Sequence, residues 1–394
     1  MRGTDAALMA PAVSGGPSRA FKAGALVMLA SFVIFSGAEL FLLGQSPLFA
    51  GAVSPGGVPV GAYLLGGQWI AMTLSDLMRP LPGGIPGATN FLMLTIAASL
   101  LGWFASTLVR RGWTPAQTAL AAALIALNPV VLLMVTSKSA PLLAVLTAGA
   151  TVLSLDRIEA IGDTQATIVF GMAFACMFAV WPDALYFGGI LLFALPLANP
   201  EVRSLSAAVA AFFIACVPAM ILVASFFLGA GWFGVSAAQL IRVWQAPLHG
   251  GATSAVAASA WLGRFGGQFW RPWAATVLLC LAAMPPMLVI PLRLMTRRRT
   301  RARPVTGVVA LLAPSLAGAL MTLFWHIASP MMPLALSIGI TSVWAVTAQL
   351  RAYERRLWIA FALCGAVIGW STPFLWQNAD TQAWRSAMIG AMGK

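Results

Sequence analysis

One acidic residue, Glu39, lies within an apolar run where a carboxylate is costly. It is flanked by Phe35-Ser36-Gly37-Ala38 on one side and Leu40-Phe41 on the other. Burial among apolar side chains raises the pKa of a carboxyl group unless a cation or metal is close, and a carboxyl group with a pKa near neutrality can act as a general base. The alternative is an acid that reaches water at a membrane surface or pairs with an arginine. Glu39 is therefore the first candidate catalytic residue.

Two further acids are candidates for the same site. Asp183 follows Trp181-Pro182 in a tight turn and is a candidate catalytic helper, although a turn residue or helix N-cap explains it equally simply. Asp76 is a candidate substrate-binding residue. It lies three residues before Arg79, a spacing that also allows an ordinary surface ion pair.

Three basic side chains, His326, Arg264 and Arg271, are candidates for binding a phosphate group. Arginine matches phosphate geometry with paired N–H donors. The alternatives are an aromatic-belt position for His326 and solvated loop charges for the arginines. The chain has two histidines and no H-x-x-x-H spacing, so a metal site is not indicated. Nucleotide-binding, nucleophile-elbow and zinc-protease motifs are likewise lacking in a usable context.

The composition defines the elements that must position these residues. With 60% hydrophobic residues, 8% charged residues and a mean hydropathy of +0.90, the chain is too apolar for a soluble domain. We expect an all-α, polytopic membrane bundle of about eleven transmembrane helices. Cys176, Cys216, Cys280 and Cys364 all fall in apolar runs, so no disulfide framework is indicated. The expected spans are approximately 23–44, 90–109, 115–134, 139–155, 165–181, 184–198, 205–230, 273–295, 305–327, 331–349 and 357–376.

The basic residues predict how this bundle is oriented. With the N-terminus inside and the C-terminus outside, the 23 lysines and arginines divide into 16 inner and 7 outer residues. This is the positive-inside pattern, and it favours a multi-pass protein of the bacterial inner membrane. The net charge of +13 then faces anionic lipid headgroups, and we expect membrane lipid rather than nucleic acid as a partner.

The expected organisation has a disordered cytoplasmic tail at 1–20, the transmembrane bundle at 21–376 and an amphipathic outer tail at 377–394. Two long outer loops cover 45–89 and 231–271. The segment Leu65–Met78 is too short to cross the membrane but apolar enough to lie on it, so we expect interfacial helices in these loops. The helix at 65–78 would cover a cavity that opens sideways to lipid.

The layout resembles the GT-C superfamily of integral-membrane glycosyltransferases, which use polyprenyl-phosphate sugars. The resemblance extends over about residues 20 to 350. It includes a first span whose N-terminus lies inside, followed by a long outer loop. The segments that carry it are Thr73-Leu74-Ser75-Asp76-Leu77-Met78-Arg79-Pro80, Arg110-Arg111, Ala121-Ala122-Ala123-Leu124-Ile125-Ala126-Leu127-Asn128-Pro129 and His326-Ile327-Ala328-Ser329-Pro330-Met331-Met332-Pro333-Leu334-Ala335-Leu336.

The resemblance implies transfer of a sugar from a polyprenyl-phosphate-linked donor on the outer face of the membrane. It implies Glu39 as base, Asp183 as helper, and His326 with Arg264 or Arg271 as phosphate contacts. No cofactor is required by any motif, and the resemblance leaves a divalent cation open. Two alternatives remain: a non-catalytic GT-C-like subunit that binds other membrane proteins, and a lipid or polysaccharide transporter or polymerase.

Overall fold

The computed structural model describes residues 17–43, 84–136, 140–180, 185–200, 202, 204–232, 270–296, 304–325 and 331–371. Every regular element in these ranges is helical, which confirms the predicted all-α class. The helices are α1 (Pro17–Leu43), α4 (Gly84–Arg110), α5 (Pro115–Ala126), α6 (Pro129–Thr136), α7 (Ala140–Ile161), α8 (Thr164–Val180), α9 (Leu185–Ala198), α10 (Leu205–Trp232), α13 (Trp270–Ala283), the 3₁₀ helix η4 (Pro285–Leu288), α14 (Val289–Thr296), α15 (Pro304–Trp325), α16 (Met331–Thr347) and α17 (Ala352–Ser371).

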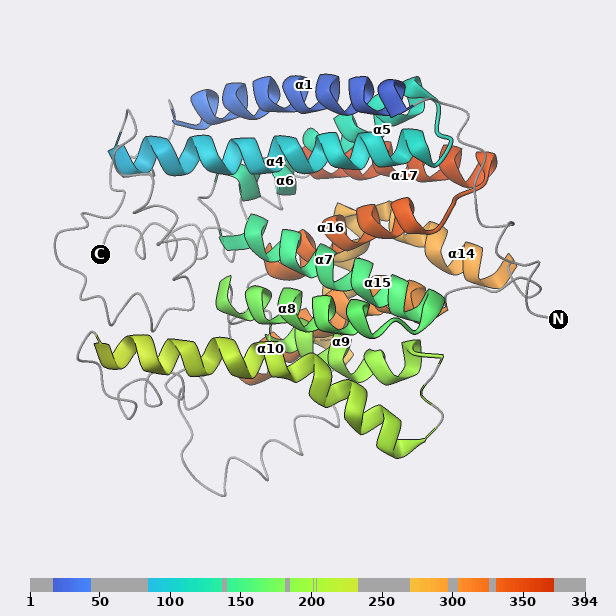
Figure 1. The fold of residues 1–394 in the computed structure, drawn as a ribbon. Coiled ribbons are helices and arrows are strands. Elements are labelled where there is room, and N and C mark those ends of the chain that lie inside the picture. The colour runs from blue at the N-terminus through green and yellow to red at the C-terminus, as the bar shows by residue number, and fades with distance from the viewer. Residues whose placement is uncertain are drawn as a thin grey trace.

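The helices stack in layers whose axes run roughly side by side (Figure 1). Helices α1 and α4 form one outer layer, with α5 and α17 packed behind them. Helices α8 and α10 form the opposite outer layer, and α7, α15 and α16 lie between the two. The layers bring helix ends that are far apart in sequence to the same end of the bundle.

Local signals explain several of the helix boundaries. Thr114 caps α5 by accepting a hydrogen bond from the Gln117 N–H, while the Gln117 side chain accepts one from the Thr114 N–H. Asp163 caps α8 by accepting a hydrogen bond from the Gln165 N–H. Gly162, with φ of 66°, ends α7 in the left-handed conformation that glycine adopts without strain.

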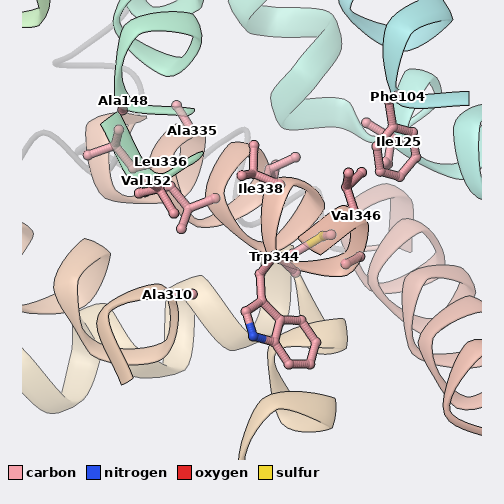
Figure 2. Packing of buried hydrophobic residues seen from close by; sticks show 14 of the residues in the cluster. Phe104, Ile125, Ala148, Val152, Ala310, Ala335, Leu336, Ile338, Trp344 and Val346 are labelled. Atoms are coloured by element: carbon pink, nitrogen blue, oxygen red, sulfur yellow. The ribbon is translucent and has the colours of Figure 1, made fainter. Parts of the chain in front are cut away.

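The core consists of apolar side chains from most of these helices. Ala148 and Val152 of α7 face Ala335 and Leu336 of α16, which lets the two helix backbones approach closely (Figure 2). These four side chains are fully buried. Such close packing fixes α7 and α16 to each other through dispersion contacts rather than hydrogen bonds.

The surface is that of a membrane protein. Among the described residues, two helical stretches, Ser18–Ala38 and Phe91–Arg110, are long and apolar enough to cross a membrane. A bent pair, Thr276–Ala283 with Pro285–Met295, raises this number to three if it counts as one span. Large apolar side chains are exposed on the outer layers, including Phe193 (81%) and Leu205 (82%). Such exposure is unfavourable in water and ordinary against lipid chains.

Two helices begin before the spans expected for them. Helix α1 begins at Pro17, inside the tail predicted at 1–20, and α4 begins at Gly84, inside the loop predicted at 45–89. A helix can continue past the apolar run that crosses the hydrocarbon, and proline is well suited to a helix's first turn. The predicted interfacial helix at 65–78 and the tail at 377–394 lie outside the described residues.

Two predicted spans are each interrupted. The run at 115–134 divides at Leu127 and Asn128 into α5 and α6. The run at 273–295 breaks at Met284 and bends by 105° into η4 and α14. Both breaks are followed by proline, which lacks the N–H that would continue the helix.

Candidate functional site

An apolar cavity of about 360 Å³ lies between the outer layer of α1 and α4 and the central layer. Helices α1, α4, α5, α6, α7 and α16 all contribute to its walls. Figure 2 shows three of the lining side chains, with Ile338 of α16 on one side and Phe104 and Ile125 on the other. The lining residues are Phe35, Ala97, Leu100, Leu101, Trp103, Phe104, Ile125, Val131, Met134, Leu142, Val145, Leu146, Gly149, Ala150, Leu153, Ile338, Gly339, Ser342 and Val343.

The lining excludes charged ligands and fits a hydrocarbon chain. Among the described residues, no lining side chain is ionisable, and the hydroxyl of Ser342 already donates to the carbonyl of Ile338 in its own helix, at 2.7 Å. Along α7 the lining runs from Leu142 to Leu153, which is about 16 Å of helix. This is roughly half the 30 Å thickness of a bilayer's hydrocarbon core, the depth of one leaflet.

The cavity opens on the side of the bundle. Trp103 of α4 is 41% exposed and Leu146 of α7 is 36% exposed, and both line the cavity. They therefore form a rim at which the cavity reaches the surface of the bundle. The sequence analysis expected a cavity open sideways to lipid, but beneath the helix at 65–78, which lies outside the described residues.

The predicted site residues are placed only in part. The backbone of Glu39 lies in α1 and that of Arg271 in the first turn of α13, but their side chains are outside the described part of the structure. Asp76, Asp183, Arg264 and His326 lie wholly outside it. What the structure adds is that Phe35, one helical turn before Glu39, lines the cavity.

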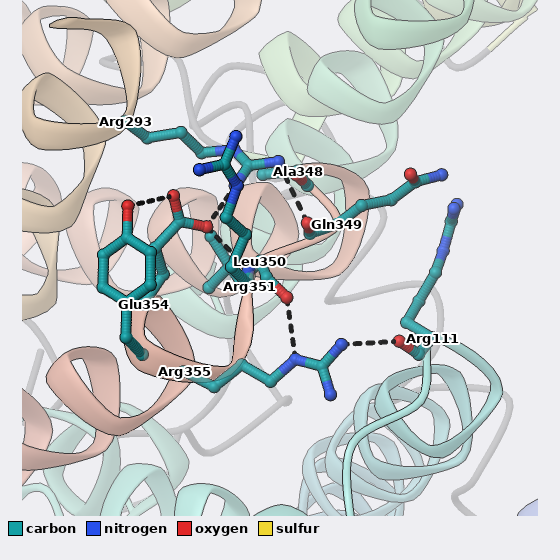
Figure 3. A network of polar contacts seen from close by, with 9 residues as sticks. Arg111, Arg293, Ala348, Gln349, Leu350, Arg351, Glu354 and Arg355 are labelled. Carbon is teal, nitrogen blue, oxygen red and sulfur yellow. Dashed lines mark hydrogen bonds and ion pairs between the residues drawn. The ribbon is translucent and has the colours of Figure 1, made fainter. Parts of the chain in front are cut away.

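A network of polar contacts occupies one end of the bundle, around the turn between α16 and α17 (Figure 3). The Arg293 side chain is 5% exposed and forms an ion pair with Glu354, whose side chain is 1% exposed. Arg293 also donates to the carbonyls of Ala348 and Gln349 at the end of α16. The same Glu354 accepts hydrogen bonds from the Arg351 N–H and the Tyr353 hydroxyl. The pair thus joins α14, α16 and α17.

Arg355 extends this network to the turn between α4 and α5. Its guanidinium donates to the carbonyls of Leu350, Arg111 and Gly112, and lies 5.7 Å from the centre of the Trp113 ring. Burial lowers the pKa of Arg355, while the Glu354 carboxylate raises it. Because the ordinary pKa of an arginine is far above neutrality, the group remains charged at neutral pH.

A second carboxylate at this end joins two further helices. Glu159, near the end of α7, accepts hydrogen bonds from the N–H groups of Val305 and Thr306 and from the Thr306 hydroxyl, at 2.6 to 2.9 Å. It therefore caps the free N–H groups in the first turn of α15. Glu159 and Glu354 were not among the predicted site residues. Their partners, 146 and 61 residues away, carry no local signal.

The two broken helices meet at one residue, Asn128. Its side-chain amide donates to the carbonyl of Ala283 at the end of α13, at 2.9 Å, and its oxygen accepts from the Val130 N–H. The carbonyl of Leu127 accepts a hydrogen bond from the Trp370 indole of α17. The backbone groups that the breaks expose are thereby paired, as a low-dielectric surrounding requires. The sequence analysis named Asn128 and Pro129 only within a segment of the GT-C resemblance.

Glycines of α17 let it approach both breaks. A Cβ atom at Gly365 would lie 2.5 Å from Cδ of Pro285, and one at Gly369 would lie 2.7 Å from Cγ of Pro129. These distances are far below ordinary contact, so only glycine fits at either position without a shift of the neighbouring proline. Two glycines four residues apart therefore seat α17 against the two prolines.

Neither a metal centre nor a known relative assigns a chemistry to the chain. Among the described residues, no group of three or more His, Cys, Asp or Glu side chains could hold a metal ion. Comparisons with protein-family models, with curated proteins and with solved structures found no match.

Proposed function

We propose that the chain is a multi-pass glycosyltransferase of the bacterial inner membrane that takes a sugar from a polyprenyl-phosphate donor. The observation that carries the proposal is the apolar cavity beside α1, open to lipid and about one leaflet deep. A polyprenyl-phosphate donor is a hydrocarbon chain with a charged head, so it requires such a cavity for the chain and polar groups beyond its end.

The arrangement of the helices supports a multi-pass topology. Counting α5 with α6 and α13 with α14, the described helices form eleven segments, and each overlaps one expected span. The described lysine and arginine side chains gather at the end of the bundle that carries the start of α1, the end of α4 and the start of α17. This end is the cytoplasmic side in the proposed topology.

Glu39 is the proposed base because of its position on α1. It lies four residues after Phe35, which places it on the same stripe of the helix and one turn nearer the outer end. In the proposed reaction, an acceptor hydroxyl loses its proton to the Glu39 carboxylate and its oxygen forms a bond to the anomeric carbon of the sugar. The bond from that carbon to the phosphate oxygen breaks with inversion, and the electron pair leaves with the lipid phosphate.

The remaining predicted residues have roles beside this step. Arg264, Arg271 and His326 would stabilise the charge on the leaving phosphate, which is the usual function of cations placed against a transferring group. Asp183 would assist the base, and Asp76 would bind the acceptor sugar or the donor head. No step of the proposal uses a metal ion.

Sugar transfer by the purified chain tests the proposal. The chain in lipid nanodiscs is supplied with a panel of polyprenyl-phosphate hexoses labelled in the sugar, together with membrane extract as acceptor. Glu39→Gln should abolish transfer, because an amide cannot accept the proton. Asp163→Asn, which changes a carboxylate at the opposite end, serves as the matched control and should leave transfer unchanged. Full activity of Glu39→Gln would rule out this mechanism.

A second function, a non-catalytic lipid-binding subunit of a larger membrane complex, is favoured by the lining of the cavity. The described lining contains no ionisable side chain and suits the binding of a hydrocarbon chain. A polyprenyl phosphate with brominated isoprene units should quench the fluorescence of Trp103 at the rim, and Trp103→Phe should remove that part of the quenching. Quenching by every lipid of the panel with transfer from none would favour the second function.

A further inference from the structure

The described acids at the cytoplasmic end of the bundle are already engaged. Glu354 pairs with Arg293, Asp163 pairs with Arg157 at 2.6 Å, and Glu159 caps α15. Asp156 is buried and has a partner as well. The exposed arginines at this end therefore have no carboxylate left to pair with among the described residues. Those around the end of α4 and the start of α17 are Arg110, Arg351 and Arg356.

Arg355 connects the turn between α4 and α5 to the turn between α16 and α17, and we call this contact the joint. It binds the Leu350 carbonyl at the start of its own helix and, across the joint, the carbonyls of Arg111 and Gly112. Figure 3 shows its guanidinium lying between the two turns. The turn between α4 and α5 is thus fixed against the turn between α16 and α17. Because Arg355 donates its hydrogen bonds to neutral carbonyls, these contacts do not neutralise the positive charge around the joint.

The joint lies at the depth of lipid headgroups. Arg110 is the last residue of Phe91–Arg110, one of the stretches long and apolar enough to cross a membrane. The residues that follow it therefore emerge at the surface of the hydrocarbon core. At that depth the phosphates of anionic phospholipids are the abundant negative groups, and a guanidinium binds them with two parallel N–H donors.

We infer that the joint formed by Arg110, Arg111, Arg351 and Arg356 is a binding site for the headgroup of an anionic phospholipid. Its ligand class is a phosphate diester at the membrane surface, and the lipid's chains lie against α4 and α17. The site is separate from the apolar cavity and does not depend on the proposed reaction. Its effect is to tie two distant parts of the chain together through one lipid.

Lipid-dependent stability of the full-length chain tests the inference. The chain in mild-detergent micelles is heated with increasing phosphatidylglycerol, with phosphatidylcholine, or with inorganic phosphate. We expect phosphatidylglycerol alone to raise the unfolding temperature, with a half-maximal effect that weakens at high salt. The double substitution Arg351→Gln/Arg356→Gln should raise the half-maximal concentration about thirtyfold, because each arginine near a charged leaflet contributes roughly a factor of five.

The matched control removes the same charge elsewhere at the same end. Arg157 lies near the end of α7, at the turn to α8, and its side chain is 56% exposed. Arg157→Gln should leave the effect of phosphatidylglycerol nearly unchanged, whereas Arg356→Gln alone should raise the half-maximal concentration about fivefold. Equal loss in these two single variants would overturn the inference, since net charge alone would then explain it. Equal stabilisation by inorganic phosphate would also overturn it.

A charge-preserving variant covers the case in which the glutamine variant does not fold. Arg351→Lys/Arg356→Lys keeps the net charge but loses the planar fork of donors. A weaker effect of phosphatidylglycerol in this variant supports the site, whereas an unchanged effect contradicts it.

Discussion

Removing one partner of the buried pair between Arg293 and Glu354 should destabilise the protein strongly. Glu354→Gln keeps the size of the side chain and one oxygen, but it leaves the Arg293 guanidinium charged at 5% exposure. The carbonyls of Ala348 and Gln349 still accept hydrogen bonds from Arg293, but they are neutral. A buried charge that loses its partner typically costs about 3–5 kcal/mol, and the lost carboxylate in the first turn of α17 adds roughly 0.5 kcal/mol.

The assay is unfolding of the purified chain in mixed micelles by increasing denaturant, followed by tryptophan fluorescence. Most of the chain's 15 tryptophans should report on the change in surroundings. The matched control is Asp163→Asn, which breaks the pair with Arg157, where the two side chains are 56% and 22% exposed. Because the amide oxygen can still accept from the Gln165 N–H, the control should lose less than about 1 kcal/mol.

The double variant Arg293→Met/Glu354→Gln separates the buried charge from the hydrogen bonds. It removes both charges and leaves the Ala348 and Gln349 carbonyls without their donor. We expect it to be more stable than Glu354→Gln alone, because replacing a whole buried pair is far less unfavourable than breaking it. Two results would refute the reasoning: a loss in Glu354→Gln no larger than in Asp163→Asn, or a double variant less stable than the single one.

Three further predictions concern the breaks and the cavity. Asn128→Ala leaves the carbonyl of Ala283 unpaired and should lower the free energy of unfolding by about 1–3 kcal/mol in the same assay, whereas an unchanged value would show that another group replaces it. Gly365→Ala should lower the free energy of unfolding by about 1–3 kcal/mol, because the added Cβ clashes with Pro285. The control Gly189→Ala, whose Cβ meets no atom within 4 Å, should be neutral or stabilising. Equal effects of the two variants would contradict the close approach of α17. Ala150→Phe should fill part of the cavity and lower the affinity for brominated polyprenyl phosphate, measured by quenching, at least roughly tenfold. A tenfold change corresponds to a loss of about 1.4 kcal/mol of chain burial. Val169→Phe, on the exposed face of α8, is the control and should leave the affinity unchanged.

The sequence was sufficient to predict the helices and insufficient to predict how they are joined. Each helix appears in the sequence as a run of apolar residues. Such a run inside lipid must be helical, because only a helix pairs all of its backbone groups internally. The interruption at Asn128 was visible as Asn-Pro in an apolar run, but its partner, the Ala283 carbonyl, lies 155 residues away. No periodicity or spacing encodes a contact of that kind.

The predicted site stays largely a prediction. The expected cavity lay beneath the helix at 65–78, which is outside the described residues, whereas the observed cavity has Phe35 of α1 in its wall. Its other walls come from helices between α4 and α16, whose apolar side chains are indistinguishable in sequence from those that face lipid. Arg293 gave a clearer signal that was not used: a cation inside an apolar run needs a buried partner, and Glu354 provides it.

The contacts at the two breaks impose an order on biogenesis. The amide of Asn128 gains its partner, the Ala283 carbonyl, only after α13 is made, and the carbonyl of Leu127 gains the Trp370 indole only after α17 is made. The gap between α5 and α6 therefore stays open until α17 has left the ribosome. In a nascent chain shorter than about 370 residues, the polar groups at this gap must be hydrated or shielded by the insertion machinery. Helix α17 thus closes the assembly, and chains truncated before it should be recognised by quality-control proteases rather than persist in the bilayer.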